Sequence, residues 1–166
     1  MTPLAAPADH PVRATSLLPR AIKVAVALWV LCALLGLLNS GLGYVLAGLG
    51  VPVNAGQRDP FGVAIGMVFA LLILALALQT GTGRAAGTRG AGNASLLLGL
   101  LYVGFAALSL LITITGQGWG GAETGLYAAA GLLAVQAVLL IAAGALARHG
   151  RDDYATWRAS RTTTAT

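Results

Sequence analysis

The sequence predicts an all-α transmembrane four-helix bundle with both termini in the cytoplasm (N-in, C-in) and a short juxtamembrane C-terminal helix. The first observation is composition: the 166 residues are 57% hydrophobic and only 9% charged, with a mean hydropathy of +0.82. Soluble domains carry about 25% charged residues. The second observation is that four long segments contain no charged residue. Such a chain cannot cover a water-facing surface with polar groups, so we expect it in a bilayer.

The uncharged segments give the four spans, at about 24–49, 61–79, 94–115 and 124–147. The shortest, 61–79, would extend roughly 28 Å as a helix at ~1.5 Å per residue, close to the hydrocarbon thickness. Lipid offers no partner to backbone N–H and C=O groups, so each span must be helical. We therefore predict one transmembrane domain over residues 21–147.

The basic residues predict the orientation. Four spans place both tails and the middle loop on one side, which carries every lysine and arginine except Arg58. Positive charge accumulates on the cytoplasmic side of membrane proteins, so that side is predicted to be the cytoplasm. Residues 1–20 contain four prolines and no apolar period, and we expect a disordered cytoplasmic tail there.

The middle loop contains GTGRAAG, residues 81–87, which resembles a phosphate-binding loop only superficially. A dinucleotide-binding fingerprint follows a strand, and a P-loop needs a lysine after its last glycine. Here a membrane span comes first, and the only lysine is Lys23. We predict no nucleotide and no nucleic acid as partner. Arg84 and Arg89 are expected to hold the loop in the cytoplasm and to touch anionic lipid.

Three helix starts are predicted from capping residues. Asp59 precedes Pro60, which suits an N-cap followed by proline at the first helical position. Asn93 is expected to cap the third helix. Glu123 or Thr124 should begin the fourth, where an acidic side chain suits the positive end of the helix dipole.

Small residues recur at helical spacing on every span. The predicted helix-packing positions are Gly36, Gly43, Gly62, Gly66, Gly99, Ala106 and Ala134. Small residues let helices approach closely in lipid, where hydrophobicity gives no help. Internal packing of the bundle is favoured over dimerisation, although a second chain could reach Gly62 and Gly66 near a helix end.

Three polar side chains, Asn39, Ser109 and Gln136, fall at similar depth in their spans. An amide in hydrocarbon needs a partner, so we expect an interhelical hydrogen-bond cluster with Gln136 turned toward the first or third helix. The alternative is a polar path for a solute. The spans contain no ionisable residue to accompany the cluster, which favours the first interpretation.

The segment 148–166 is predicted to be a basic and aromatic cytoplasmic tail. Within RHGRDDYATWRASR, the residues Tyr154, Trp157, Arg158 and Arg161 come together on one side of a helix. A basic, aromatic helix beside a membrane is typical of an interfacial anchor. The alternative is a docking peptide for a cytoplasmic partner.

Neither metal, cofactor nor enzymatic chemistry is predicted. Cys32 is the only cysteine, and His10 and His149 lie far apart in the sequence, so no metal-ligand spacing is present. No serine, cysteine or carboxylate has a base at a recognisable spacing. We therefore expect a non-enzymatic protein without cofactor.

Nine arginines against one lysine, with abundant alanine and glycine, are typical of GC-rich coding sequences. With its four spans and its Arg/aromatic tail, the chain resembles the uncharacterised small four-span integral membrane proteins of GC-rich bacteria. That resemblance implies a multi-pass protein of the bacterial cytoplasmic membrane.

Two functions follow as hypotheses. The first is an accessory or scaffold subunit that meets another membrane protein, or itself, through its small-residue helix faces. The alternative is a small permease or channel component with a polar path near Asn39, Ser109 and Gln136.

Overall fold

The computed structural model describes residues 17–53, 55–116 and 122–163. This part of the chain is helical and contains no strand. Its elements are α1 (Arg20–Gly48), the 3-10 turn η1 (Ala55–Arg58), α2 (Pro60–Gly81), α3 (Thr88–Thr115), α4 (Glu123–His149) and α5 (Arg151–Thr163). Most of the predicted N-terminal tail, residues 1–16, lies outside the described residues.

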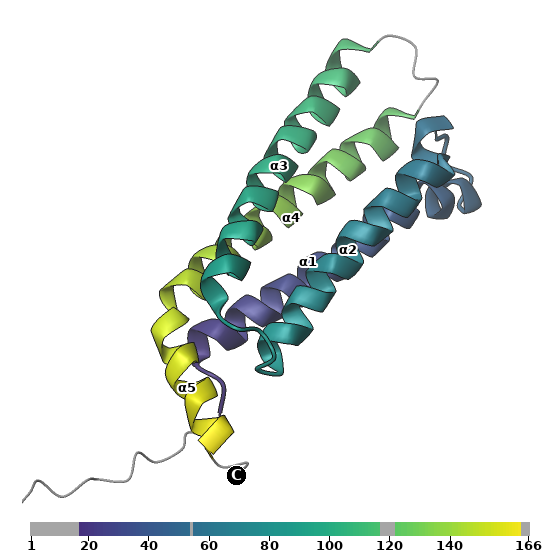
Figure 1. Cartoon of the computed structure of the whole chain (residues 1–166). Coiled ribbons are helices and arrows are strands. Elements are labelled where there is room, and N and C mark those ends of the chain that lie inside the picture. The colour runs from purple at the N-terminus through teal and green to yellow at the C-terminus, as the bar shows by residue number, and fades with distance from the viewer. Residues whose placement is uncertain (1–16, 54, 117–121, 164–166) are drawn as a thin grey trace, which may run out of the picture.

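The predicted all-α four-helix bundle is confirmed. Helices α1 to α4 are each long and apolar enough to cross a membrane, and they run alternately up and down beside one another (Figure 1). The start of α1, the α2–α3 loop and α5 lie together at one end, which we call the inner end. The turn η1 lies at the other, outer end.

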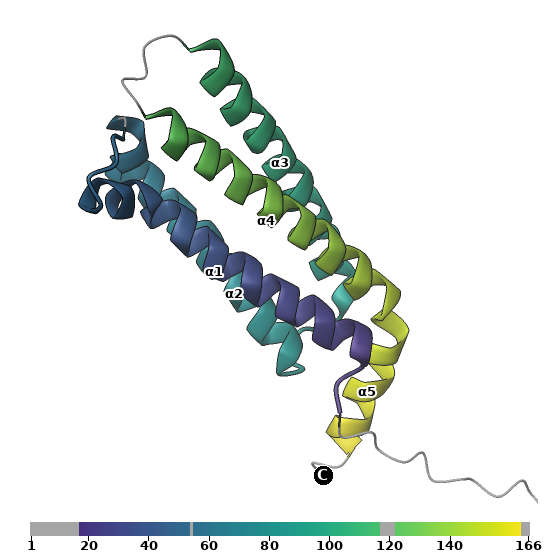
Figure 2. The same ribbon diagram turned by 180° about the vertical axis from the view of Figure 1, so that it is seen from behind.

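The bundle is open along one side. Helix α3 packs on α4, α4 packs on α1, and α1 packs on α2, but the backbones of α2 and α3 scarcely approach each other. Figure 2 shows α1 lying over α2 and facing α4, with α3 beyond α4. The order across the bundle is therefore α2, α1, α4, α3, and its two ends do not close into a ring.

The interior is rich in alanine with a few large side chains, and most of the larger aliphatic side chains face outward. The main core consists of Ala25, Trp29, Cys32, Ala33, Ile73, Ala77, Tyr102, Ala137, Leu140, Ala143 and Ala147. Outside, Leu97 is 70% exposed and Val138 is 66% exposed. Water would penalise that surface, whereas lipid tails solvate it, so the distribution supports a bilayer as the solvent.

The start of α2 is as predicted. Asp59 is the N-cap, its Oδ2 accepts a 2.8 Å hydrogen bond from the Gly62 N–H, and Pro60 takes the first helical position. Glu123 begins α4, also as predicted. The predicted cap at Asn93 is wrong: α3 begins at Thr88, with Gly87 as N-cap, so Asn93 lies inside the helix.

Glycine in the left-handed region ends two of the helices. Gly83 follows α2 with φ of 77°. Its N–H donates to Thr80 O at 3.2 Å, and the Arg84 N–H donates to Gln79 O at 2.9 Å. This pair of bonds is a Schellman motif, which satisfies carbonyls at a helix C-terminus and favours glycine. Gly50, with φ of 75°, ends α1 in the same way. The end of α2 therefore explains why position 83 is a glycine.

Candidate functional site

Most of the predicted small-residue positions pack inside the chain. A methyl group added at Gly36 would lie 3.1 Å from Ala70 Cβ and 3.2 Å from Gln136 Oε1. One added at Gly99 would lie 2.7 Å from Ile141 Cγ1. Gly66 approaches the Ser40 hydroxyl on α1, and Gly43 approaches the backbone of Gln57 in η1. These glycines permit the α1–α2, α1–α4 and α3–α4 contacts.

The other three positions lie on the outside or near it. Gly62 is exposed, and a methyl group there would have a neighbour within 4 Å only in the Asp59 carboxylate among the described residues. Ala106 and Ala134 line a groove of about 490 Å³ between α3 and α4, which we call the α3–α4 groove. Its lining also includes Ala107, Ala130 and Gly131. The predicted small-residue positions thus include both internal helix contacts and one outward-facing surface.

Two of the three predicted polar residues, Asn39 and Gln136, line the same cavity. Gln136 is only 1% exposed and turns toward α1, beside Gly36. Its Nε2 donates to Leu132 O in its own helix at 3.1 Å. Asn39 is half-buried, and its Oδ1 is buried without a hydrogen-bond partner among the described residues. The inward orientation of Gln136 is as predicted, but its amide N–H is satisfied within α4.

Asn39 and Gln136 line one cavity of about 200 Å³ that is bordered by all four long helices, which we call the central cavity. Ser40 from α1 and Tyr102 from α3 also belong to the lining, with the Ser40 hydroxyl donating to Gly36 O at 2.8 Å, and Gly62 and Gly66 form part of the α2 wall. Ser109 does not belong to this lining, although Asn39 and Gln136 do. The backbone carbonyl of Ser109 accepts the Thr113 hydroxyl at 2.7 Å.

The central cavity borders on a second hollow along the open side of the bundle. This α2–α3 groove has a volume of about 440 Å³ and an almost wholly apolar lining. Phe69 of α2 and Leu101 of α3 line both the groove and the cavity. None of the residues lining either hollow is charged. A mainly apolar cavity that contains a few amide and hydroxyl side chains therefore adjoins an apolar groove on the open side of the bundle.

A buried hydrogen-bond relay beside the groove was missed in the sequence. Trp29 Nε1 donates to Ser95 Oγ at 2.8 Å, and Ser95 Oγ donates to Leu140 O at 2.6 Å. The relay connects α1, α3 and α4. A signal was available, because the indole N–H of a tryptophan within a span needs an acceptor.

At the inner end, α5 folds back onto the α2–α3 loop and the start of α1. Tyr154 is 1% exposed and Trp157 is 3% exposed, and both rings pack with Ile22. The Tyr154 hydroxyl donates to Ala85 O at 3.1 Å, and Arg158 Nη1 donates to Ala86 O at 3.1 Å. We call this arrangement the inner clamp.

The inner clamp covers the two rings that were predicted to anchor α5 in the lipid interface. The rings of Tyr154 and Trp157 are covered by protein, while the Arg161 guanidinium lies 5.1 Å from the centre of the Trp157 ring. Little ring surface is left to enter a lipid interface. Anchoring of α5 to lipid stays a prediction, and it now depends on the arginines.

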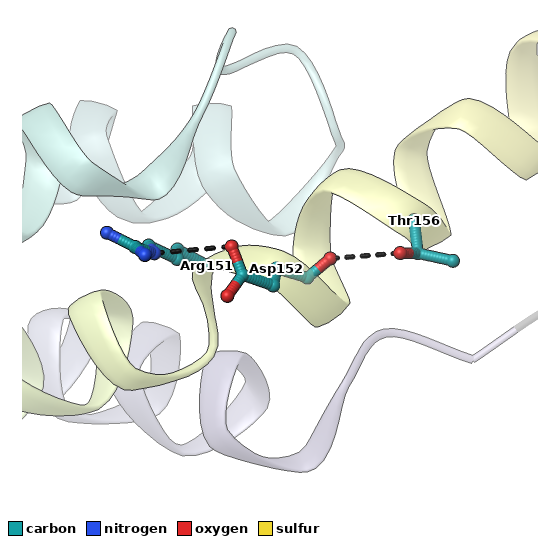
Figure 3. Close-up of polar contacts among 3 residues, drawn as sticks. All are labelled: Arg151, Asp152 and Thr156. Carbon is teal, nitrogen blue, oxygen red and sulfur yellow. Dashed lines mark hydrogen bonds and ion pairs between the residues drawn. The ribbon is translucent and has the colours of Figure 1, made fainter.

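The first turn of α5 is exposed and polar. Figure 3 shows Arg151 Nε paired with Asp152 Oδ1 at 3.2 Å, and the Thr156 hydroxyl donating to the Asp152 carbonyl at 3.0 Å. Solvent-exposed ion pairs of this kind contribute little stability. The docking of α5 therefore depends on its aromatic face.

The pKa of the Tyr154 hydroxyl is raised in the inner clamp. Burial raises the pKa of its hydroxyl above the ordinary value of 10.0, and the nearby positive charge of Arg158 opposes that rise. The protonated form is also the one that donates to Ala85 O. The clamp is thus built for a neutral tyrosine.

Within the described ranges, no three His, Cys, Asp or Glu side chains come together to hold a metal ion. The thiol of Cys32 is buried in the bundle. The polar groups that do converge are amides and hydroxyls, in the central cavity.

The fold and these hollows define the class: a multi-pass helical membrane protein with an open four-helix bundle. The chain matches no protein-family model, no curated protein and no solved structure.

Proposed function

We propose that the chain is a non-enzymatic accessory or scaffold subunit that receives a transmembrane helix of another membrane protein in its α3–α4 groove. One observation carries the proposal: the groove presents small residues outward, at Ala106, Ala107, Gly131 and Ala134. Small residues are what close helix–helix approach in lipid requires. We place the protein in the cytoplasmic membrane of a bacterium because of its arginine-, alanine- and glycine-rich composition, and its inner end in the cytoplasm because of the charge bias.

The dimensions of the groove support this role. A methyl group added at Gly131 would meet no atom within 4 Å among the described residues, so a partner backbone has free access there. Val103 and Leu110 flank the groove on α3, and Val138 flanks it on α4. A partner helix would gain dispersion contacts with the floor and both walls.

A matched pair of glycine variants tests the proposal. Gly131 and Gly104 are both helical, exposed and free of neighbours within 4 Å, but only Gly131 lines the groove. A photoreactive amino acid at Val138 should give a discrete crosslinked product in native membranes. Gly131→Leu should abolish that product, and Gly104→Leu should leave it. Equal products from both variants would rule out the groove as the docking site.

The central cavity favours a second candidate, a small permease or channel component, because Asn39 and Gln136 converge there. Proteoliposomes would then shrink and swell faster with glycerol than protein-free liposomes do, and Asn39→Leu would slow the exchange. Exchange at the rate of protein-free liposomes would eliminate this candidate and leave the accessory role.

A further inference from the structure

We propose that the central cavity and the α2–α3 groove together form a binding site for an uncharged, membrane-dissolved amphiphile. Its small hydrogen-bonding head would occupy the cavity, and its apolar chain would lie in the groove. The site is separate from the α3–α4 groove of the proposed function and lies on the other side of α3.

The cavity offers hydrogen-bonding capacity that the protein leaves unused. Asn39 Oδ1 is buried and has no partner among the described residues. Gln136 Nε2 has two protons, and one of them is directed to Leu132 O. A buried polar group without a partner costs free energy. A hydroxyl head in this cavity can accept from the second Nε2 proton of Gln136 and, once the Asn39 side chain turns toward it, donate to Asn39 Oδ1.

The lining excludes a charged head. No lysine, arginine, histidine, aspartate or glutamate is among the residues around the cavity or the groove. An ion placed there would lose its hydration without gaining a counter-charge. An uncharged head loses much less, and the amides and hydroxyls replace its hydrogen bonds to water.

The depth of the site points to the same class of ligand. Tyr102 and Gln136 lie near the middle of α3 and α4, so the inner part of the cavity is about half-way through the spans, and the cavity extends outward to Gly62 in the first turn of α2. The headgroup of a phospholipid stays at the membrane surface because of its charge. A molecule with a weakly polar head dissolves at the depth of Gln136 and can reach this inner part of the cavity.

The open side of the bundle gives a route of entry. Leu72 and Leu76 on α2 face Leu97 and Leu98 on α3 across the groove, and the two backbones do not close on each other. A chain can therefore enter sideways from the lipid. Phe69 and Leu101 stand where groove and cavity meet, so the head passes between them.

The experiment uses the full-length protein in phosphatidylcholine nanodiscs and a photoreactive derivative of farnesol, an uncharged isoprenoid alcohol, as the probe. Labelling should map to α2 and α3. Farnesol should compete with it, whereas farnesyl phosphate and the corresponding hydrocarbon without the hydroxyl should compete at least about threefold less well, as expected for one lost hydrogen bond or an added charge.

Two variants with a matched control complete the test. Leu101→Trp should fill the junction and reduce labelling, whereas Leu100→Trp should not, because Leu100 is 62% exposed and lines neither hollow. Asn39→Leu should weaken competition by farnesol about three- to tenfold. If Leu101→Trp does not fold, Leu72→Trp in the groove wall serves instead.

The proposal is overturned if the alcohol and the hydrocarbon compete equally, or if Leu101→Trp and Leu100→Trp label alike. The first outcome would show that the cavity does not recognise the hydroxyl group of the ligand. The second would show that labelling occurs from bulk lipid. Either result leaves the crosslinking test of the α3–α4 groove unaffected.

Discussion

The indole nitrogen of Trp29 donates a 2.8 Å hydrogen bond to the hydroxyl of Ser95, which in turn donates to the carbonyl of Leu140. Three helices are connected at one point in the interior, including α1 and α3, whose backbones scarcely approach each other. The relay fixes how these helices are rotated about their axes, and hence which residues face the central cavity.

Ser95→Ala should lower the free energy of unfolding by about 0.5–2 kcal/mol, because it removes the acceptor of the buried Trp29 N–H. Trp29→Phe should cost a similar amount, and the double variant less than the sum of the two. Circular dichroism during SDS titration in mixed micelles measures these values. Thr115→Val is the control, since that hydroxyl is exposed and bonds within its own helix. Strict additivity would show that the two side chains act independently.

Gly36→Ala should destabilise the bundle by about 1–3 kcal/mol, because overfilling a packed interior displaces its neighbours. The added methyl group would lie 3.1 Å from Ala70 Cβ. Combining it with Ala70→Gly should restore part of the loss, because the contact of the methyl group with Gln136 Oε1 at 3.2 Å stays. Gly41→Ala should cost nothing, since that position has no neighbour within 4 Å among the described residues. Equal losses for Gly36→Ala and Gly41→Ala in the same SDS titration would refute the packing argument.

Features that depend on local chemistry could be predicted from the sequence. The four spans follow from uncharged length, and the Asp59 cap depends on residues within one turn. The Asn93 cap failed because α3 continues six residues further toward the inner end, to Thr88 with Gly87 as N-cap. A hydrophobicity pattern cannot show where a helix ends once it has left the membrane, since polar residues continue it equally well.

Features that depend on the arrangement of helices could be predicted only in part. Six small or polar residues recur at helical spacing on α3: Ser95, Gly99, Tyr102 and Thr113 are buried, but Ala106 and Ser109 between them are only half-buried. Both views show α3 and α4 drawing apart toward the outer end (Figures 1 and 2). The spacing of residues along one helix gives a face but does not give the angle at which a second helix crosses it. The open α2–α3 side was for the same reason not foreseen.

Raising the pH should release the inner clamp. The pKa of Tyr154 is higher in the folded protein than its ordinary value of 10.0, so the neutral hydroxyl contributes stability that is fully present below about pH 10. That stability is lost as the pH rises through the higher pKa of the folded state. Tryptophan fluorescence followed from pH 8 to 12 should show a step above pH 10. The step should be absent in Tyr154→Phe, and its persistence there would assign it to another group.

The charge bias gives a topology that can be tested in intact cells. A cysteine replacing Ala86 should resist a membrane-impermeant thiol reagent, and one replacing Ala55 should react with it. Both positions are exposed, so burial does not interfere, and native Cys32 is buried. Reaction at position 86 without lysis would reverse the orientation.

The inner clamp can form only at a late stage of synthesis. Helix α5 follows all four spans in the chain, so it leaves the ribosome after them, and domains generally fold from the N-terminal side during synthesis. Until Tyr154 and Trp157 arrive, Ile22 at the start of α1 lacks the rings that cover it. The first span must therefore wait, partly uncovered, for residues translated more than a hundred codons later. The inner clamp can therefore form only after the whole membrane domain has been synthesised.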